Sequence, residues 1–268
     1  MAVKTLHGRE LSFEALLEKL DRTAMPRHIA IIMDGNRRWA KSRSLPPLMG
    51  HRAGAKVFKT IVETFVKLGI GVLTAYAFSC ENWKRSEDEV GVLLSLFEYY
   101  SRKERNHLQK NGVRFRIIGN IDELPPSLSD EFSKTEELTR GNDRLVLNLA
   151  VNYGSRSEIM KAALALSRDL SLGAVRASEV TEELFSRYLL TAGLPDPDLL
   201  IRTSGEMRVS NFLLWQIAYS ELWFTSSYWP EFTPRELLTA ILDYQKRERR
   251  FGGSTVQAHP CKTSSSRL

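Results

Sequence analysis

The segment 29-IAIIMDGNRRW-39 decides the fold, because a short apolar run stops abruptly at a charged loop. The run Ile29–Met33 has the length and isoleucine content of a buried strand. Asp34 follows, then a Gly that lets backbone N–H groups approach a ligand, and then two arginines. Paired guanidinium groups suit phosphate oxygens, and a carboxylate among them fits an anion carried with a divalent metal. The segment therefore predicts a strand that delivers a diphosphate–metal site.

Apolar, β-branched-rich runs recur along the chain and alternate with helical patterns. The further runs are Val72–Phe78, Val113–Ile118, Leu145–Val151, Leu199–Ile201 and Leu222–Phe224. Helices are expected over Val57–Leu68 with Gly69 as C-cap, after a capping box at Ser86–Glu89, over Ser157–Leu170 and over Pro234–Lys246. This alternation predicts an α/β fold: a single domain whose central, mostly parallel sheet of about six strands is flanked by helices.

Bulk properties narrow the class of protein. No apolar run reaches the length of a membrane-spanning helix, and the N-terminus does not resemble a targeting peptide. Two cysteines far apart in sequence indicate a reducing compartment, so a cytoplasmic location is expected. The net charge of +6 favours an anionic partner. Residues 1–24 are expected to form a helical extension that packs on the domain, 25–253 the main domain, and 254–268 a disordered tail.

Several ligand classes lose support because their motifs are missing from the sequence. There is no G-x-G-x-x-G after the first strand and no G-x-x-x-x-G-K-[ST], which counts against dinucleotide and P-loop sites. No Cys/His spacing suits zinc. Basic residues are not interleaved with aromatic residues along one segment, so nucleic acid is not the expected partner.

Polar loops that carry arginine follow three of the apolar runs. They are DGNRRW at 34–39, SCENWKR at 79–85 and RTSGEMRVSN at 202–211. In an open α/β sheet the ligand crevice lies beyond the carboxyl ends of the strands, so these loops should converge. Several arginines at one edge repel each other unless an anion is present, and two diphosphates would be a natural partner. The arginines concerned are Arg38, Arg85, Arg202 and Arg208, and Ser204, Gly205 and Ser210 add further donors.

Each candidate also has a plainer interpretation. Asp34 could be an ordinary turn residue before Gly, but the adjacent arginines favour a metal or catalytic carboxylate. Arg37 is by default a solvated charge. Glu221 is either a second metal carboxylate, supplied across a subunit contact, or a solvated helix end.

The loop after the second run offers proton-handling and stacking groups. Asn82 and Ser79 could position or shuttle a proton, and Trp83 could stack on a substrate or belong to the core. Cys80 is interpreted as a small loop residue. His51, expected to open a helix after Gly50, either donates to an anion or is structural.

The assembled segments resemble the cis-prenyltransferase family, and the bacterial-type undecaprenyl diphosphate synthases in particular. The segments are HIAIIMDGNRRWA, GH at 50–51, LTAYAFSCENWKR, VRFRIIGN, LNLAVNYGSR, DLLIRTSGEMRVSNFLLWQIAYSEL and RERRFGG. They run in order from about residue 25 to residue 253. The resemblance implies a homodimeric, Mg²⁺-dependent enzyme that condenses isopentenyl diphosphate onto an allylic diphosphate. Contact with a membrane through the lipid product is a further expectation.

The resemblance also implies roles for individual residues. Asp34 would be the essential Mg²⁺-associated aspartate, Asn82 the proton acceptor, and Glu221 a metal-site glutamate near the dimer interface. The allylic substrate would be held by Gly35, Asn36, Arg37, Arg38, Trp39, His51, Ser79, Cys80, Glu81, Trp83 and Arg85. Isopentenyl diphosphate would be held by Arg202, Arg208, Val209 and Ser210. An apolar tunnel for the growing chain would be walled by the helix face Val90–Phe97 and the strand Leu145–Val151, for which core packing is the plainer interpretation.

The sequence departs from the family pattern at a few positions. Pro47 stands where bacterial relatives usually carry a phosphate-binding Arg, and Arg37 replaces a common Gly and could compensate. Cys80 replaces a frequent Ser, and Met207 replaces a His found in some relatives. The alternatives are a non-catalytic accessory subunit, which in this family loses the Asp loop, a short-chain Z-prenyl diphosphate synthase, and a module that binds anionic polymers.

Overall fold

The structure is a computed structural model that describes residues 12–248. Six strands form one sheet in the order β3-β4-β2-β1-β5-β6, and every neighbouring pair is parallel. The strands are β1 (His28–Ile32), β2 (Val72–Ser79), β3 (Val113–Ile118), β4 (Leu145–Tyr153), β5 (Leu199–Arg202) and β6 (Glu221–Phe224). The predicted α/β sheet is therefore confirmed, and its apolar runs are the strands.

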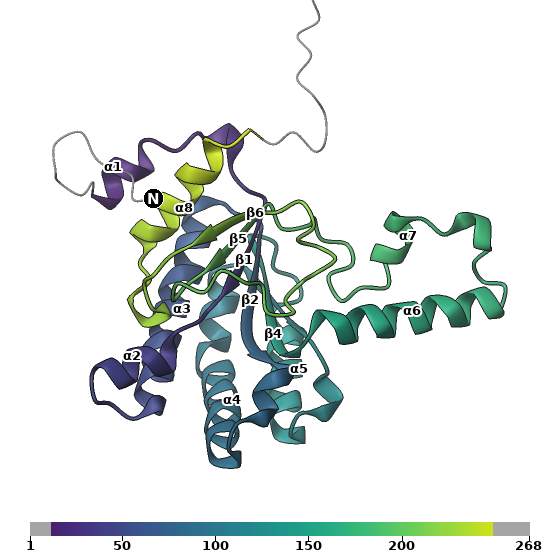
Figure 1. Ribbon diagram of the computed structural model, residues 1–268, viewed down its shortest axis with the longest axis horizontal. Helices are drawn as coiled ribbons and strands as arrows, with labels where there is room; N and C mark the ends of the chain where they lie inside the picture. Colours follow the sequence, from purple (N-terminus) through teal and green to yellow (C-terminus); the bar gives the residue numbers. More distant parts are fainter. Residues whose placement is uncertain (1–11, 249–268) are drawn as a thin grey trace, which may run out of the picture.

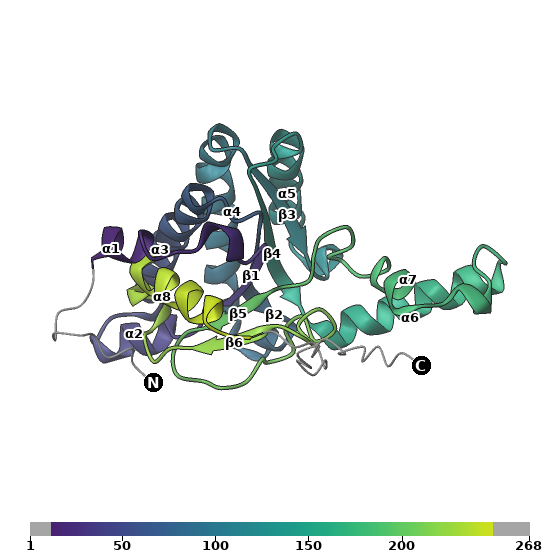
Figure 2. The same cartoon turned by 90° about the horizontal axis from the view of Figure 1, so that it is seen from above.

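Helices cover the sheet and one pair projects from it (Figures 1 and 2). They are α1 (Phe13–Leu17), α2 (Asn36–Ser42), α3 (Pro47–Leu68), α4 (Glu87–Lys110), α5 (Pro126–Thr139), α6 (Ser155–Ser171), α7 (Glu182–Ser186) and α8 (Pro234–Gln245). Short 3₁₀ turns are η1 (Arg22–Ala24), η2 (Cys80–Lys84), η3 (Ile121–Glu123), η4 (Ala177–Glu179) and η5 (Trp229–Glu231). Helices α3, α4 and α5 stand together, whereas α6 and α7 form an arm that leaves the body. No helix within residues 12–248 combines the length and apolarity needed to cross a bilayer.

Two helix starts differ from the sequence-based expectation. Ser86 does precede α4, but its side chain makes no capping bond, and the Glu89 carboxylate pairs with Arg85 and Arg37 instead of completing a capping box. His51 does not open a helix: α3 already begins at Pro47, so His51 lies about one turn inside. Proline at a first helical position costs no hydrogen bond, which explains the earlier start.

The N-terminal apolar face packs on the protein, as expected. Leu16 and Leu20 are buried, and Phe13 and Leu17 pack against the same cluster. Helix α1 contacts α8, so the start and end of the described chain lie side by side (Figure 1). The expected tail at 254–268 lies outside the described residues.

The sheet order places the site. Strands β2, β1 and β5 are adjacent and parallel, so the loops after Ser79, Ile32 and Arg202 leave the sheet at the same edge. Ligand crevices in open parallel sheets form at this edge. The three Arg-bearing loops converge there because the strands that precede them are neighbours.

Candidate active site

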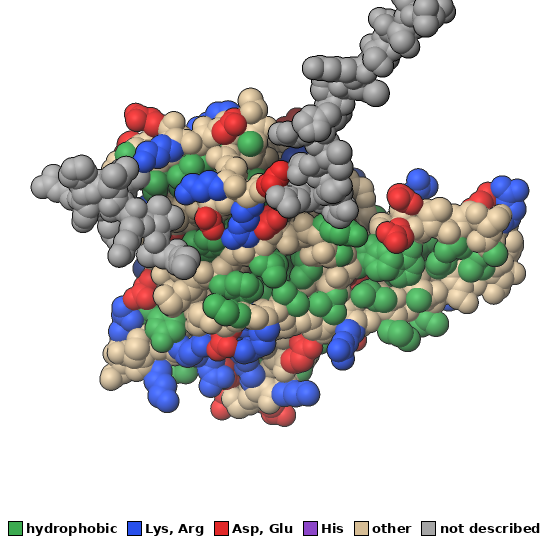
Figure 3. Space-filling model, turned by 45° about the horizontal axis from the view of Figure 1, so that its top comes forward, with side chains coloured by type: hydrophobic (Ala, Val, Ile, Leu, Met, Phe, Trp, Pro, Cys, Tyr) green, Lys and Arg blue, Asp and Glu red, His purple; other side chains and the backbone are tan. Residues whose placement is uncertain are grey.

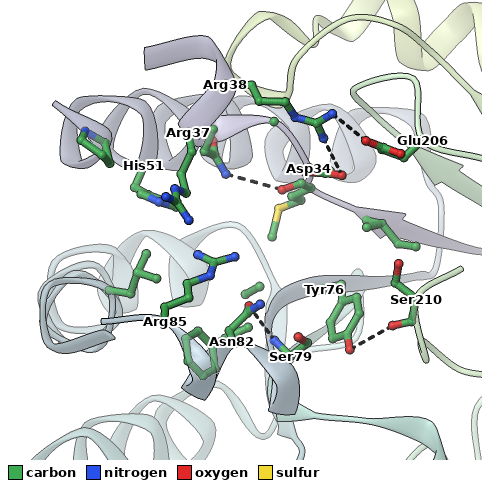
Figure 4. A pocket seen from close by; sticks show the side chains of 18 of the residues that line it. Asp34, Arg37, Arg38, His51, Tyr76, Ser79, Asn82, Arg85, Glu206 and Ser210 are labelled. Carbon is green, nitrogen blue, oxygen red and sulfur yellow. Dashed lines mark hydrogen bonds and ion pairs between the residues drawn. The ribbon is translucent and has the colours of Figure 1, made fainter. Parts of the chain in front are cut away.

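A cavity of about 1140 Å³ opens beyond the carboxyl ends of β1, β2 and β5 (Figure 4). Six cationic side chains line it against three carboxylates. The cations are Arg37, Arg38, Lys41, Arg85, Arg202 and Arg208, and the carboxylates are Asp34, Glu81 and Glu206. This surplus of positive charge in a concave site focuses a field that attracts a multiply charged anion.

The loop after β1 is held at Asp34, whose backbone N–H and carbonyl both bond to the Thr203 side chain. The Asp34 N–H donates to Thr203 Oγ1 (3.0 Å), and that hydroxyl donates to the Asp34 carbonyl (2.7 Å). Gly35 has φ +104°, and a Cβ there would lie 2.8 Å from Ser204 Oγ and from Tyr228 Cδ1. Glycine is therefore required between the carboxylate and the arginines, both for its dihedral angle and for its size.

One carboxylate oxygen of Asp34 receives two guanidinium groups. Oδ2 lies 2.9 Å from Arg38 Nη2 and 2.9 Å from Arg202 Nη2. Burial raises the pKa of Asp34, but the hydrogen bonds and charges of Arg202 and Arg38 outweigh it, so the pKa is lowered overall. The carboxylate is therefore ionised at neutral pH.

Arg202 joins the first loop to the loop that follows β5. Its side chain is only 5% exposed, and it donates to Asp34, to Ser210 Oγ (2.7 Å) and to the Arg208 carbonyl. Glu206 plays a parallel part, since it pairs with Arg38 (2.8 Å) and with Arg208. Two Arg-bearing loops that are about 170 residues apart in sequence thus form one charged network.

The opposite wall holds a second group of cations. Glu89 lies 3.4 Å from Arg37 and 3.0 Å from Arg85, so it links α2 to the turn before α4. His51 faces these arginines (Figure 4). Burial, then the nearby Arg85, lowers the pKa of His51 to about 4, so the ring is neutral at physiological pH. A neutral imidazole can donate to an anion without adding charge.

The turn after β2 presents Asn82 to the cavity. The Asn82 Oδ1 accepts the Ser79 backbone N–H (3.0 Å), which orients the amide. Glu81 accepts from Asn211 Nδ2 (3.0 Å), which ties this turn to the loop after β5. Burial works against ionisation of Glu81, but the Asn211 bond and others lower its pKa overall.

Several buried polar atoms around the cavity have no partner within the described chain. They are Asn36 Oδ1, Trp39 Nε1, His51 Nε2, Arg202 Nε and Ser204 Oγ. Buried donors and acceptors in proteins are nearly always satisfied, so a cluster of unsatisfied atoms at one place indicates a polar ligand. Three of these residues, Asn36, His51 and Arg202, line the cavity.

The structure brings together most of the residues predicted for the site. The cavity is lined by Asp34, Gly35, Asn36, Arg37, Arg38, His51, Ser79, Glu81, Asn82, Arg85, Arg202, Arg208 and Ser210. Pro47 also lines it. Trp39, Cys80, Trp83, Val209 and Glu221 are not among the lining residues.

The surroundings of Trp39, Trp83 and Cys80 show what these residues do instead of lining the cavity. The Trp39 ring lies under the Arg43 guanidinium, 4.6 Å from its centre. Trp83 Nε1 donates to Asn152 Oδ1 (2.7 Å). Burial, with the charge of Glu81, raises the pKa of the Cys80 thiol, which disfavours a thiolate nucleophile. This agrees with the interpretation of Cys80 as a small loop residue.

Glu221 lies at the other edge of the sheet from Asp34 within one chain. The strand register pairs Ile29 with Leu199, and Leu199 with Glu221, so Glu221 is level with the start of β1. Asp34 lies five residues beyond Ile29, roughly 16 Å along the strand direction. Glu221 pairs instead with Arg247 at 2.7 Å. The chain does not itself bring the two carboxylates together.

Sequence reasoning missed several residues that shape the site. Glu206 and Asn211 lie inside the RTSGEMRVSN loop, but their pairing with Arg38 and Glu81 depends on folding. Tyr76 lines the cavity, and its hydroxyl donates to the Tyr153 carbonyl (3.0 Å). In the sequence Tyr76 is a single tyrosine within an apolar strand, and such a tyrosine does not by itself indicate a site.

The side chains of the site can be compared with the ligands that Mg²⁺ prefers. Within residues 12–248 no group of three or more His, Cys, Asp or Glu side chains could hold a metal. Mg²⁺ usually takes one or two protein carboxylates, substrate phosphate oxygens and waters, so a single ionised Asp34 beside a diphosphate cradle fits it. The residues therefore suit an ion that arrives with the diphosphate, not a dedicated metal cage.

A second, apolar cavity of about 170 Å³ adjoins the first. The two share Met33, Asn36, His51, Ala77 and Leu93 as lining residues. The second cavity runs between α3, α4 and the sheet, and its lining includes Leu96, Phe97, Leu147 and Leu149. The expected apolar space is present, walled by the predicted helix face and strand.

Comparisons with known proteins identify the class. Residues 32–252 match the family model Prenyltransf, described as "Putative undecaprenyl diphosphate synthase". The chain belongs to this family of isoprenyl transferases.

Relatives and solved structures agree over most of the chain. An isoprenyl transferase of Geobacter sulfurreducens is 51% identical over 233 residues, covering 87% of this chain and 95% of the relative. One of Bacillus anthracis is 51% identical over 245 residues, covering 91% and 95%. The structure of lavandulyl diphosphate synthase from Lavandula x intermedia, in complex with dimethylallyl diphosphate, superposes with a TM-score of 0.83 at 38% identity, covering 86% of this chain and 99% of that one. A probable undecaprenyl diphosphate synthase from Campylobacter jejuni gives a TM-score of 0.71 at 33% identity, covering 85% and 98%.

Proposed function

We propose that the protein elongates prenyl chains in the cis sense. It condenses isopentenyl diphosphate repeatedly onto an allylic diphosphate, farnesyl diphosphate in the first instance, and releases diphosphate. The product is a long-chain Z-polyprenyl diphosphate such as undecaprenyl diphosphate. One observation carries the proposal: two arginine clusters, Arg37, Arg38 and Arg85 in one and Arg202 and Arg208 in the other, line one cavity that adjoins an apolar one, and Asp34 pairs with both Arg38 and Arg202.

The first cluster suits the allylic diphosphate. Ionising an allylic diphosphate places negative charge on the departing group, and preorganised cations stabilise that charge most strongly in a site that excludes water. Arg37 and Arg38 both belong to α2, and Arg85 and neutral His51 lie near Arg37 in the same cavity. Asp34 would hold Mg²⁺ together with the diphosphate, and the ion would supply further charge neutralisation.

The second cluster suits isopentenyl diphosphate. Arg202 at the end of β5 lies with Arg208 and Ser210 of the following loop, and the three offer guanidinium and hydroxyl donors. Forming the new carbon–carbon bond leaves a proton to be removed, and we assign its acceptance to Asn82, which lines the same cavity as Arg208 and Ser210. The growing apolar chain enters the second cavity, away from water.

The oligomer is proposed to be a homodimer. Large apolar side chains are exposed on the α6 arm and beside β6, where Met160, Leu164, Leu172 and Tyr219 are 62–74% exposed. Figure 3 shows a continuous apolar band from the body onto the arm. A second copy packed on this band would bury it, and Glu221 lies at the start of β6, two residues after Tyr219, where a subunit contact could bring it to a partner's site. Light scattering that shows a monomer at micromolar concentration would contradict this proposal.

A radiolabelled isopentenyl diphosphate assay with farnesyl diphosphate and Mg²⁺ tests the function. The expected result is incorporation into butanol-extractable product that stops when a chelator is added. No incorporation, with or without chelator, would leave the accessory-subunit alternative. The lipid product also leads us to propose peripheral contact with a membrane, which flotation of the active enzyme with vesicles would measure.

A short-chain Z-prenyl diphosphate synthase is the second candidate. The apolar cavity is small, about 170 Å³, and one structural neighbour is a lavandulyl diphosphate synthase. Chromatography of the product decides between the two, because one added unit or many give well-separated chain lengths.

A further inference from the structure

The segment at the end of β4 has no part in the proposed chemistry, although its Asn152 contacts the η2 turn, which carries Asn82. Asn152 lies there with φ 50°, a left-handed conformation that Asn tolerates better than most residues. Only 1% of its surface is exposed. A buried polar side chain in a strained conformation persists only where its surroundings require it.

Every hydrogen-bonding atom of the Asn152 side chain has a partner. Oδ1 accepts from Trp83 Nε1 (2.7 Å), and Nδ2 donates to the Asn120 carbonyl (3.0 Å) and to Glu123 Oε2 (2.8 Å). Its own carbonyl accepts from the Cys80 thiol (3.2 Å). One residue thus connects the η2 turn to the η3 turn.

These contacts control the turn that carries Asn82. Successive side chains in a 3₁₀ turn point about 120° apart, so fixing the direction of Trp83 also fixes that of Asn82. Trp83 is held at two places, by its bond to Asn152 and by its edge-on contact with Phe78 (centroids 5.5 Å apart). Asn82 is then left facing the cavity (Figure 4).

We propose that Asn152 is a positioning residue for prenyl transfer: it fixes the rotation of the η2 turn and therefore the place of Asn82. This rests on the proposed function, in which Asn82 accepts the proton. Asn152 itself touches neither cavity. Its effect is on the rate of the chemical step, because Arg38, Arg202 and Arg208 are held by contacts outside the η2 turn, and Arg85, which follows the turn, is held by Glu89 of α4.

The chemistry of the site explains why an asparagine is needed. A donor, the Trp83 indole, faces Oδ1, and an acceptor, the Glu123 carboxylate, faces Nδ2. Asp at this position would place a second carboxylate against Glu123, and the repulsion between the two would displace the side chain and break its bond to Trp83. Gln at position 123 would relieve that repulsion, because its amide can donate to the new carboxylate.

The test compares Asn152→Asp, Glu123→Gln and the double variant. Asn152→Asp is expected to lower kcat about 10- to 100-fold with both KM values within about threefold, since a displacement of about 1 Å costs this much. Glu123→Gln is the matched control and should be near wild type, because its amide oxygen still accepts from Asn152. The double variant should recover most of kcat.

A second readout does not depend on activity. In isotope-labelled protein the Trp83 indole N–H should be protected from solvent exchange in wild type and in the double variant, and should lose protection in Asn152→Asp. Wild-type kcat in Asn152→Asp, or a double variant that regains thermal stability but neither kcat nor protection, would overturn the proposal. An inactive wild-type enzyme that still shows the protection pattern would instead count against the proposed function.

Discussion

Replacing Asp34 by Asn removes the charge that two guanidinium groups share while keeping the shape of the side chain. Both Arg38 and Arg202 lie 2.9 Å from one oxygen of this carboxylate, Oδ2. Breaking a fully buried ion pair costs about 3–5 kcal/mol, but the Asp34 side chain is 27% exposed and the Arg38 side chain 41%. Solvent screening reduces the expected loss in the free energy of unfolding to about 1–2 kcal/mol.

The effect of Asp34→Asn on turnover should be much larger than its effect on stability. Loss of the carboxylate that would hold the metal with the departing diphosphate should lower kcat/KM on the order of 1000-fold. Binding of inorganic diphosphate without Mg²⁺ should be unchanged or tighter, because the cavity becomes more positive. Steady-state kinetics and calorimetry measure these quantities, with Asp243→Asn, a carboxylate paired with Arg247 at 3.1 Å, as the control. Turnover within tenfold of wild type would refute the role assigned to Asp34.

Three further outcomes are expected. Gly35→Ala should lower both melting temperature and kcat, because φ is +104° and the new methyl group would lie 2.8 Å from Ser204 and Tyr228; unchanged melting and kinetics would contradict this. Burial lowers the pKa of His28 to about 4 from 6.5, so its contribution to stability is present above pH 6.5 and is lost as pH falls toward 4. By pH 5 the loss is about 2 kcal/mol, measurable by urea denaturation and absent in His28→Gln. Ala55→Phe should fill the apolar cavity and shorten the product, as chromatography would show; an unchanged chain length would place the growing chain elsewhere.

The strands and their shared polar edge could be anticipated because they depend on short-range signals. The run Ile29–Met33 and its counterparts are apolar over whole strands, which is typical of sheets covered on both faces. In a parallel sheet the polar loops that follow the strands leave at the same edge. Asp34, Arg85 and Arg202 were therefore expected to lie close together. The apolar cavity was expected from the family resemblance, with the Val90–Phe97 helix face as one of its walls.

The directions of individual side chains could not be anticipated in the same way. Trp39 and Trp83 lie in the predicted loops, but neither lines the cavity, because helical phase turns one toward Arg43 and the other toward Asn152. The role of Glu206 could not be predicted for a related reason, since only the fold brings its two arginine partners together. Single-residue spacing in short turns carries too little information to fix such directions.

The most direct measurement of the central claim is carbon NMR of the product made from isopentenyl diphosphate, farnesyl diphosphate and Mg²⁺. If the two arginine clusters hold the two diphosphates as proposed, every added double bond should be Z, while those of the farnesyl primer stay E. Added units with E double bonds, or no added units in an enzyme shown to be folded, would contradict the account.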